Sequence, residues 1–465
     1  MKPSTEYRKK VIRTQMKLYE HQQEGLQAVQ DLDHVAFYWD MGLGKTFAGS
    51  EKLHQLGARV NLVVCQKSKV QDWLDHFFNH YSGSHKFPEK KVAVAWDLTD
   101  PKDMINFFTA ISNEVWQVQH VGVINYDLLW RRPELKNLQN FTLLLDESSL
   151  IQNETSKRAK FILKMHPANV ILLSGTPTGG KYEKLWSQMR LLGWKISKDL
   201  YWKQFVKVEY LDTVGRSIPI VTGYKNIDRL KRKMKQYGCQ FLKTDEVFDL
   251  PSQNFQKVRV DTSPEYRTFK KDRVVEVHTG VYDHLINSEW DGKTFDDLHE
   301  LVGDTTLTKM LYERMLCGAY SKAKMKAFAD LLDSTEDRLI VFYNFTAELE
   351  AMKGICDRIE RPYSVVNGKV KDLSAYEQKS DSVTFLQHQA GAMGLNLQKA
   401  CRMVFFTLPL SSELYEQAKK RIHRIGQKKL CFYYQLICKG SIEEKILRTL
   451  EMRKDYTEKL FEKDE

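Results

Sequence analysis

Apolar residues in the first part of the chain gather in short runs separated by longer amphipathic stretches. In one such stretch, residues 68–81, the apolar positions recur at the spacing of a helix. The short runs are predominantly apolar, as is typical of strands buried on both faces. They cover residues 34–39, 60–65, 91–96, 120–125, 141–145 and 169–173. Strands that alternate with helices predict an α/β fold built on a parallel sheet.

The pattern changes at about residue 182 and returns at about residue 330. Between these positions the chain is basic, and its pattern predicts helices with few strands. Apolar runs then reappear, at residues 338–343, 382–387, 401–406 and 431–437. We therefore predict two α/β lobes in tandem with helical insertions between them.

Pro251 is the candidate junction between the lobes. The first lobe is predicted to cover residues 1–250, with a helical protrusion at about 182–240. The second is predicted to cover residues 251–465, with a helical insertion at about 262–325. Residues 441–465 predict a final bracing helix, since four apolar residues share one helical face there: Ile442, Ile446, Leu447 and Leu450.

Composition narrows the class of protein. A chain of 465 residues with 42% hydrophobic and 28% charged residues is typical of a globular protein with more than one domain. The net charge of +11 favours a polyanionic partner such as nucleic acid, although a solvated basic surface would give the same charge. The seven cysteines form no C-x-x-C pair, and no secretory signal or membrane span is expected. We expect a cytoplasmic protein without a membrane partner.

A candidate phosphate loop follows the first predicted strand, in the stretch YWDMGLGKTFAG at 38–49. Gly42 and Gly44 allow a tight turn and close approach of a ligand, and backbone N–H groups of the turn can then hold phosphates. Lys45 would reach the β- and γ-phosphates and Thr46 would help to hold Mg²⁺. Trp39 departs from the strict motif, which has a small residue at that position.

Asp146 and Glu147 follow the apolar run LLL, where a metal-binding acid and a general base would stand next to a phosphate loop. The alternative is a polar turn after a buried strand. A second turn of small residues, LLSGTPTGG at 172–180, follows another predicted strand. Ser174 and Thr176 are either simple turn residues or sensors of the γ-phosphate.

Two arginines near the C-terminus are candidates for contact with a triphosphate. Arg421 and Arg424 are three residues apart, so they would share one face if the stretch 415–429 is helical. Guanidinium groups stabilise charge on a transferring phosphoryl group. A solvated basic face and a contact with the DNA backbone are the alternatives.

The motifs taken together, in their order, resemble helicase superfamily two, and DMGLGKT (40–46) with RIHRIGQ (421–427) is most similar to the Swi/Snf-type DNA translocases. The resemblance covers about residues 18–450 and implies two RecA-like lobes that bind ATP and Mg²⁺. Gln22 would then contact the adenine, and Ser174, Gly175 and Thr176 would couple nucleotide state to movement. The resemblance implies further contacts with the nucleotide from Met41, Leu43, Gly394, Arg421 and Arg424, with Lys45, Asp146 and Glu147 as the catalytic groups.

The same resemblance implies sequence-independent contacts with double-stranded DNA. The residues expected to face it are Lys67, Ser68, Asn125, Tyr126, Asn344, His388 and Gly391. Ser148 and Ser149 depart from the small residue and His that usually follow Asp-Glu, Gln66 replaces a frequent Pro, and residues 407–413 lack the usual Asp-x-x-Trp-Asn-Pro run. These departures suggest a minimal member of the family, of the kind found in bacteria and phages.

The resulting hypothesis is a monomeric DNA-dependent ATPase that moves along or remodels duplex DNA, in replication, recombination or repair. A protein partner is expected to target it, in the cytoplasm of a bacterial or phage-infected cell. One alternative is a helicase that separates the strands of forked or branched DNA. The other is a DNA-binding scaffold that responds to ATP with little turnover.

Overall fold

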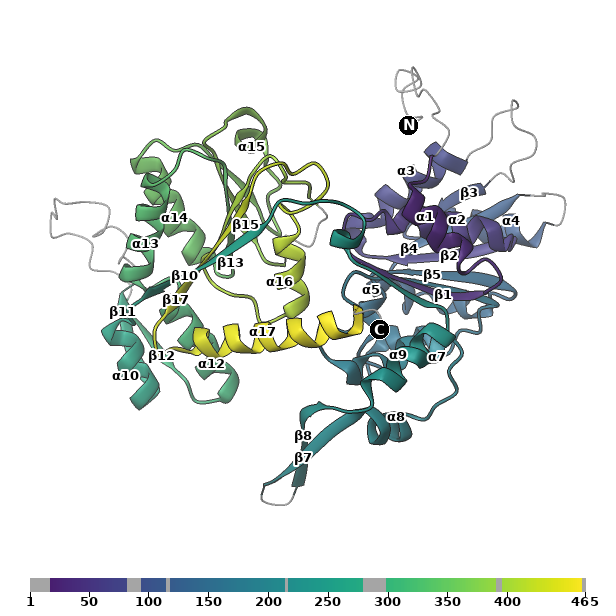
Figure 1. Ribbon diagram of the computed structural model, residues 1–465, viewed down its shortest axis with the longest axis horizontal. Helices are drawn as coiled ribbons and strands as arrows, with labels where there is room; N and C mark the ends of the chain where they lie inside the picture. The colour runs from purple at the N-terminus through teal and green to yellow at the C-terminus, as the bar shows by residue number, and fades with distance from the viewer. Residues whose placement is uncertain are drawn as a thin grey trace. The chain divides into compact units, whose positions relative to one another are not determined.

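The computed structural model describes residues 17–81, 93–113, 118–213, 216–278, 298–389 and 395–461. The chain forms two compact units (Figure 1): the first comprises Met1–Val247 together with Tyr456–Glu465, and the second comprises Phe248–Asp455. Each unit has its own parallel sheet and its own hydrophobic core. We refer to them as the first and second lobe.

The first lobe contains a seven-stranded sheet in the order β3-β4-β2-β5-β6-β1-β9, in which every pair is parallel. The strands are β1 (His34–Trp39), β2 (Val60–Cys65), β3 (Ala93–Asp97), β4 (Gln119–Asn125), β5 (Phe141–Asp146), β6 (Asn169–Leu173) and β9 (Cys239–Leu242). The helices are α1 (Glu20–Gln27), α2 (Lys45–Leu56), α3 (Val70–Tyr81), α4 (Pro101–Ser112), α5 (Tyr126–Leu129), α6 (Lys157–Ile162), α7 (Trp186–Leu191), α8 (Lys198–Phe205) and α9 (Ile227–Gln236). Because β1, β5 and β6 are neighbours, the turns that follow them meet at one edge of the sheet.

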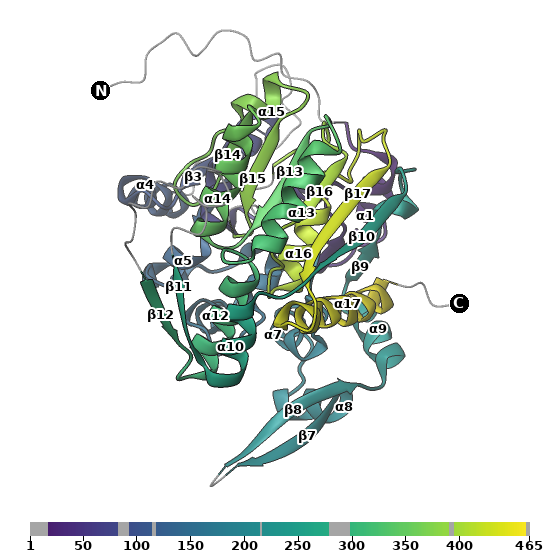
Figure 2. The same cartoon turned by 90° about the vertical axis from the view of Figure 1, so that its left-hand side faces the viewer.

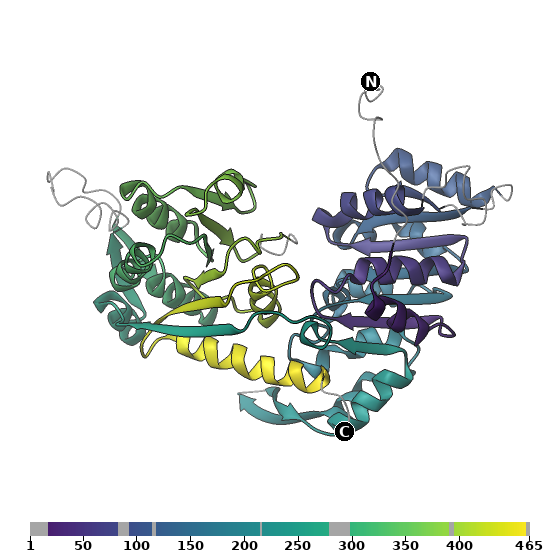
Figure 3. The ribbon, with the colours of Figure 1, turned by 45° about the horizontal axis from the view of Figure 1, so that its top comes forward.

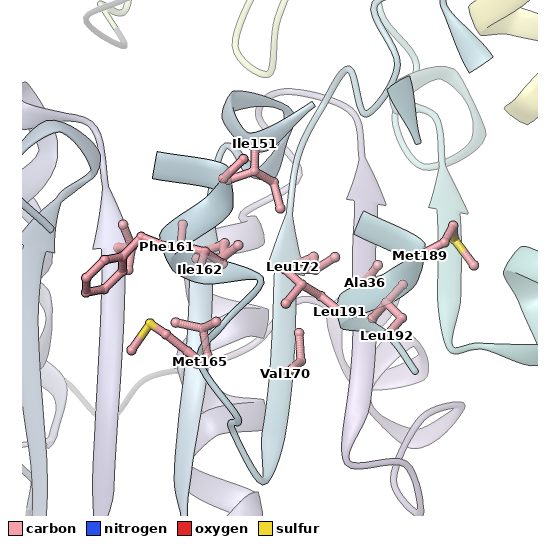
Figure 4. Packing of buried hydrophobic residues seen from close by; sticks show 14 of the residues in the cluster. Ala36, Ile151, Phe161, Ile162, Met165, Val170, Leu172, Met189, Leu191 and Leu192 are labelled. Carbon is pink, nitrogen blue, oxygen red and sulfur yellow. The ribbon is translucent and has the colours of Figure 1, made fainter. Parts of the chain in front are cut away.

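The core of the first lobe forms where helices cover a sheet of continuous apolar strands. In Figure 4, Phe161 and Ile162 of α6, and Met189 and Leu191 of α7, pack beside the sheet residues. The sheet residues drawn there include Ala36, Val170 and Leu172, all with no exposed surface. This packing holds α7 against the face of the sheet, next to the edge where the turns after β5 and β6 lie.

The second lobe contains a six-stranded parallel sheet in the order β10-β17-β16-β13-β15-β14. Its strands are β10 (Gln253–Val260), β13 (Leu339–Tyr343), β14 (Tyr363–Val366), β15 (Val383–Gln387), β16 (Arg402–Phe405) and β17 (Cys431–Cys438). The helices are α10 (Pro264–Asp272), α12 (Thr306–Cys317), α13 (Lys322–Asp333), α14 (Thr346–Arg358), α15 (Ser374–Gln378), α16 (Ser412–Lys419) and α17 (Ile442–Phe461). The predicted fold class, two parallel-sheet α/β lobes in tandem, is therefore confirmed.

The last helix, α17, packs on the second lobe as its apolar face predicts. Ile446, Leu447 and Leu450 are buried in the core of this lobe, and Glu451 pairs with Lys257 of β10 at 2.8 Å. In Figures 1 and 3, α17 is drawn in yellow and runs beside the edge formed by β10 and β17. The helix thus covers the edge strand of the second sheet.

The prediction that residues 182–330 are poor in strands is wrong. This segment contains an antiparallel hairpin of β7 (Val206–Thr213) and β8 (Arg216–Tyr224), a second one of β11 (Val274–His278) and β12 (Leu298–Val302), and the sheet strands β9 and β10. The first hairpin projects from the rest of its lobe (Figure 2). These strands carry polar residues and are only partly buried, so they lack the continuous apolar pattern of strands covered on both faces.

Within the described residues, no helix is long and apolar enough to cross a membrane. All seven cysteines are buried, and none forms a disulfide.

Candidate nucleotide site and nucleic-acid contacts

The turn between β1 and α2 has the backbone of a phosphate loop. Gly42 and Gly44 have φ angles of +92° and +72°, in the left-handed region that favours glycine. A Cβ atom on Gly44 would also come within 2.1 Å of the Gln22 Nε2 atom. α2 begins directly afterwards at Lys45, so its free N–H groups and its dipole favour an anion at this turn.

Side chains from α1 and from the end of the first lobe hold this loop. Gln22 donates from Nε2 to the Leu43 carbonyl at 3.1 Å, and the His21 Nε2 atom lies 3.0 Å from the same oxygen. The Asp40 carboxylate accepts hydrogen bonds from the backbone N–H and hydroxyl of Thr244, at 3.2 and 3.3 Å. Gln22 therefore lies on the phosphate loop, while its contact with adenine stays a prediction.

The Lys45 amine is hydrogen-bonded within the phosphate loop, and it would exchange these bonds for a phosphate. Its Nζ atom donates to the carbonyl oxygens of Trp39 and Asp40, at 2.8 and 3.1 Å. These bonds hold the amine in the same turn as the N–H groups that would bind phosphate.

Asp146 is the last residue of β5, and its carboxyl group is held by an indole. The Trp73 Nε1–H of α3 donates to Asp146 Oδ2 at 2.9 Å. Burial raises the pKa of this carboxyl, while the Trp73 hydrogen bond and the positive charges of Lys45 and Lys69 act in the opposite direction. Lys45 follows the loop after β1 and Asp146 ends β5, so both lie at the carboxyl edge of the same parallel sheet.

Glu147 follows in a strained backbone conformation. Its φ and ψ angles are 55° and 59°, a left-handed geometry that costs energy for a residue with a side chain. The Tyr126 hydroxyl donates to the carbonyl oxygens of Asp146 and Glu147, at 3.0 and 3.4 Å. Strain of this kind is typical of functional turns, and the two Tyr126 hydrogen bonds hold this turn.

The turn after β6 lies against the phosphate loop. A Cβ atom on Gly175 would be 3.3 Å from Met41 Cγ and 3.5 Å from Lys45 Nζ. The Ser174 hydroxyl accepts from the Thr176 N–H at 3.1 Å, and the buried Thr176 Oγ1 has no hydrogen-bond partner among the described residues. A ligand at Lys45 would therefore lie close to a hydroxyl that can donate to it.

Gln188 of α7 connects three of these segments. Its Oε1 atom accepts from the hydroxyl groups of Ser148 and Tyr38, at 2.8 and 3.0 Å. Its Nε2 atom donates to the Pro177 carbonyl at 2.8 Å, and the side chain is fully buried. Ser148, which departs from the family pattern, is thus part of a network that joins the Asp146–Glu147 turn to the turn after β6.

These residues fit a magnesium-bound nucleoside triphosphate. The loop N–H groups and Lys45 would hold the phosphates, and Thr46 in the first turn of α2 would share the metal ion with Asp146. Hydroxyl and carboxylate oxygens are the ligands that Mg²⁺ prefers. Gly391 and Gly394, the other glycines predicted for ligand contacts, lie outside the described residues.

In the second lobe, Asn344 and His388 meet at the carboxyl ends of β13 and β15. Asn344 donates from Nδ2 to Thr407 Oγ1 at 2.9 Å, and the His388 Nε2 atom lies 2.9 Å from the Thr407 carbonyl. Glu348 accepts from the N–H groups of Asn344 and Phe345, at 2.9 and 3.1 Å, and burial raises its pKa to about 7. These hydrogen bonds join Asn344, Glu348 and His388 around Thr407.

We predict that His388 makes the second lobe sensitive to acid. Burial lowers the pKa of His388 to about 4, from an ordinary value of 6.5. A histidine with a lowered pKa contributes stability that is complete above pH 6.5 and is lost as the pH falls towards 4. The contribution of His388 to this loss should be about 2 kcal/mol at pH 5 relative to pH 7. It is opposed by Glu348, whose pKa of about 7 means that proton binding by this carboxyl stabilises the folded lobe over the same interval, so the effect of His388 is read from the difference between wild type and variant.

Urea denaturation of the wild type and of His388→Gln at pH 7 and pH 5 measures this effect. Glutamine keeps a donor for Thr407 but cannot bind a proton, so the variant should lose less stability than the wild type between the two pH values. Equal losses in both proteins would exclude His388 as the source.

Arg421 and Arg424 do not lie on a helix, so the condition under which they would share one helical face is not met. α16 ends at Lys419, and the residues that follow form turns. The Arg421 carbonyl accepts from the Leu397 N–H at 3.1 Å, so tertiary contacts replace the helical pattern here. Arg421 is 6% exposed, and burial lowers the pKa of the partly exposed Arg424 guanidinium.

The residues predicted to face nucleic acid differ in exposure. Lys67 and Ser68 are exposed at the start of the segment that leads into α3, as backbone contacts require. Asn125, Tyr126 and His388 are 7%, 2% and 3% exposed. The side chains of Tyr126 and His388 are already bonded inside their lobes, so the structure does not support them as surface contacts.

Comparison with known protein families identifies the family of this chain. Residues 21–318 match the SNF2-related domain, and residues 323–426 match the helicase conserved C-terminal domain. The chain belongs to the SNF2-related family. The two matched domains support the predicted class of enzyme, an ATP-hydrolysing, helicase-like enzyme of superfamily two.

Individual relatives of this SNF2-related chain are distant. It is 24% identical over 440 residues to the mouse SWI/SNF-related matrix-associated actin-dependent regulator of chromatin subfamily A member 1, covering 89% of this chain and 40% of the relative. It is 23% identical over 490 residues to an uncharacterized ATP-dependent helicase of Mycoplasma genitalium, covering 96% and 42%. The chain thus spans less than half the length of these curated relatives.

Among solved structures, the Sulfolobus solfataricus SWI2/SNF2 ATPase core in complex with dsDNA aligns with a TM-score of 0.43 and 18% identity. The alignment covers 96% of this chain and 93% of that chain.

Sequence reasoning missed three residues that shape the SNF2-related site: Trp73, Gln188 and Thr244. Trp73 lies in the stretch after the second strand, but nothing local marks its indole as the partner of Asp146. Gln188 stands in an amphipathic helix, where a buried amide resembles any other polar position. A polar residue on the apolar face of α7 was the signal available for Gln188.

We predict that Gln188→Leu destabilises the first lobe. Leucine fills a similar volume but leaves the buried hydroxyl groups of Tyr38 and Ser148 without their acceptor, at a cost of about 2–4 kcal/mol in free energy of unfolding. Chemical denaturation measures the loss.

A double-mutant cycle separates this network from general packing. In the Gln188→Leu background, Ser148→Ala removes one of the stranded hydroxyls and should cost less than it does in the wild type. Additive losses would contradict the network, since they would show that Ser148 and Gln188 act independently.

Proposed function

We propose that the protein is a DNA-dependent ATPase that couples ATP hydrolysis to movement along double-stranded DNA. The observation that carries this proposal is the meeting of three turns at one edge of the first sheet. These turns are the phosphate loop after β1, the acid turn after β5 and the turn after β6. Gly175 of the last turn lies beside Lys45 of the phosphate loop, and the charge of Lys45 acts on Asp146. Membership of the SNF2-related family supports the same reaction.

Each group in the first lobe has a role in this proposal. The loop N–H groups and Lys45 bind the phosphates, and Thr46 and Asp146 bind Mg²⁺, which neutralises phosphate charge when bound. Glu147 orients the attacking water and accepts its proton. Ser174, Gly175 and Thr176 register the γ-phosphate, and the Gln188 network joins that turn to Glu147.

The second lobe supplies Arg421 and Arg424, which stabilise negative charge as the phosphoryl group is transferred. Lys67 and Ser68 of the first lobe contact the DNA backbone, so binding is independent of sequence. Replication, recombination or repair in a bacterial or phage-infected cell is the proposed setting.

The experiment that tests movement compares two displacement assays. A pure translocase should release the third strand of a DNA triplex in the presence of ATP and leave a forked duplex paired. Unwinding of the fork would favour a strand-separating helicase instead. The Lys45→Ala variant is the control, since displacement that persists without the phosphate-binding amine would not depend on ATP.

A further inference from the structure

Positive charge is concentrated on one segment of the first lobe. Residues 198–236, which form α8, the β7–β8 hairpin and α9, contain ten Lys and Arg residues but four Asp and Glu residues. Their net charge of +6 is more than half of the +11 carried by the whole chain of 465 residues. The family motifs discussed above contain none of these residues, so their role is separate from the nucleotide site.

The helix α9 presents this charge on a fixed surface. Leu230 and Met234 have no exposed surface and anchor one side of the helix in the core of the lobe. Arg229 and Arg232 are exposed on the other side, with Lys233 partly exposed beside them. We refer to Arg229, Arg232 and Lys233 as the basic face of α9.

Contacts with α8 hold the start of α9 in place. The Asn226 amide donates to the Gln204 carbonyl at 2.8 Å, and the Arg229 guanidinium donates to Gln204 Oε1 at 2.9 Å. Among the described residues, no acidic side chain forms an ion pair with any member of the basic face. Its charge is therefore oriented by neutral groups and is not neutralised within the lobe.

We propose that the basic face of α9 binds the sugar–phosphate backbone of double-stranded DNA, as a contact additional to Lys67 and Ser68. This inference rests on the proposed function. A helix rises by about 1.5 Å per residue, so the basic face extends about 6 Å, and one DNA strand advances about 3.4 Å per phosphate. Two or three phosphates therefore lie within reach of the three long side chains.

A membrane surface fits this helix less well. Interfacial helices insert an apolar face among lipids, but the apolar face of α9 is buried within the lobe. An acidic protein would also be attracted by the charge. The regular spacing of phosphates and the DNA-dependent function favour DNA, and the measurement below separates the two, because an acidic-protein site would leave DNA affinity unchanged.

The test is the salt dependence of duplex binding. Each phosphate contact contributes about 0.9 to the slope of log affinity against log salt concentration. The triple variant Arg229→Gln/Arg232→Gln/Lys233→Gln should lower the magnitude of this slope by about 2–3, and raise the DNA concentration that half-saturates the ATPase at least about tenfold. Turnover at saturating DNA should be unchanged, because none of the three residues belongs to the nucleotide site.

The matched control removes the same charge elsewhere. Arg267, Lys271 and Lys326 are exposed on α10 and α13 of the second lobe, and their triple replacement by Gln lowers the net charge equally. The inference is overturned if the slope of the α9 variant equals that of the wild type, or if both triple variants change it equally. The single variant Arg232→Gln, expected to lower the slope by about 0.9, serves if the triple variant folds poorly.

Failure of the proposed function gives a different result. A wild type that neither binds duplex DNA nor is stimulated by it would overturn both proposals before any variant is made. If DNA stimulates the wild type and the α9 triple variant has the same salt slope as the wild type, the inference about α9 is overturned and the proposed function is not.

Discussion

Glu147→Gln should bind ATP with nearly wild-type affinity and lose turnover by about 10²–10⁴-fold. The substitution removes the carboxylate that accepts the proton of water, but it leaves the phosphate loop, Lys45 and Asp146 in place. The amide also keeps the size of the side chain at a turn that the hydroxyl group of Tyr126 already holds. Equilibrium binding of a fluorescent ATP analogue and phosphate release at saturating ATP measure the two quantities separately.

The matched control is Glu134→Gln, at an exposed position in the same lobe. This variant should retain both binding and turnover, because Glu134 lies in a separate 3₁₀ turn, at Pro133–Asn137. Turnover of Glu147→Gln close to that of the control would remove Glu147 from the role of general base.

Arg424→Ala should reduce turnover by about 10³-fold or more, with ATP affinity changed only a few fold. An arginine that stabilises the transferring phosphoryl group acts mainly in the transition state, so its loss lowers kcat more than it weakens binding. Arg424 remains charged at neutral pH even though burial lowers its pKa. Single-turnover hydrolysis and nucleotide titration distinguish the two effects.

Arg448→Ala controls for the loss of a positive charge, since Arg448 is exposed on α17 of the same lobe. Arg424→Lys adds a second comparison, because lysine keeps the charge without the planar guanidinium and should recover only part of the turnover. Weak ATP binding together with normal turnover at saturation would contradict the assignment of Arg424.

The sequence predicts the sheets well where burial is continuous. The runs at 34–39, 60–65 and 169–173 coincide with β1, β2 and β6, because strands covered on both faces are apolar throughout. It fails for β10 (Gln253–Val260), which is mostly exposed at the edge of its sheet and carries polar residues along its length. Four-residue strands such as β9 and β14 are too short to give a clear pattern.

In the candidate site too, residues marked by a local sequence pattern are predictable, and contacts between residues far apart in the chain are not. Gly44, Lys45 and Asp146 are predictable because a turn after a parallel strand must lie at the carboxyl edge of the sheet, whatever the rest of the fold does. The bond from Trp73 to Asp146 and the bonds of Gln188 join residues far apart in the chain. Side-chain contacts of this kind depend on how helices pack, which no local pattern specifies.

The stretch 415–429, where Arg421 and Arg424 would share a face if it were helical, shows how tertiary contacts override a local pattern. The stretch contains no glycine before Gly426 and no proline, so its local pattern favours a longer helix. In the structure, Ile422 is fully buried and the Gln427 side chain donates to the carbonyls of Ile422 and Ala400, at 3.0 and 2.8 Å. These contacts stabilise turns in place of the last part of the helix.

The central claim is that duplex DNA controls ATP hydrolysis by this chain. Steady-state phosphate release, measured at saturating ATP and Mg²⁺ with and without a duplex of mixed sequence, tests it most directly. We expect release to rise at least about tenfold with duplex DNA, and the increase to disappear in Glu147→Gln. A rate that is the same with and without DNA, in a protein that binds ATP, would contradict the claim.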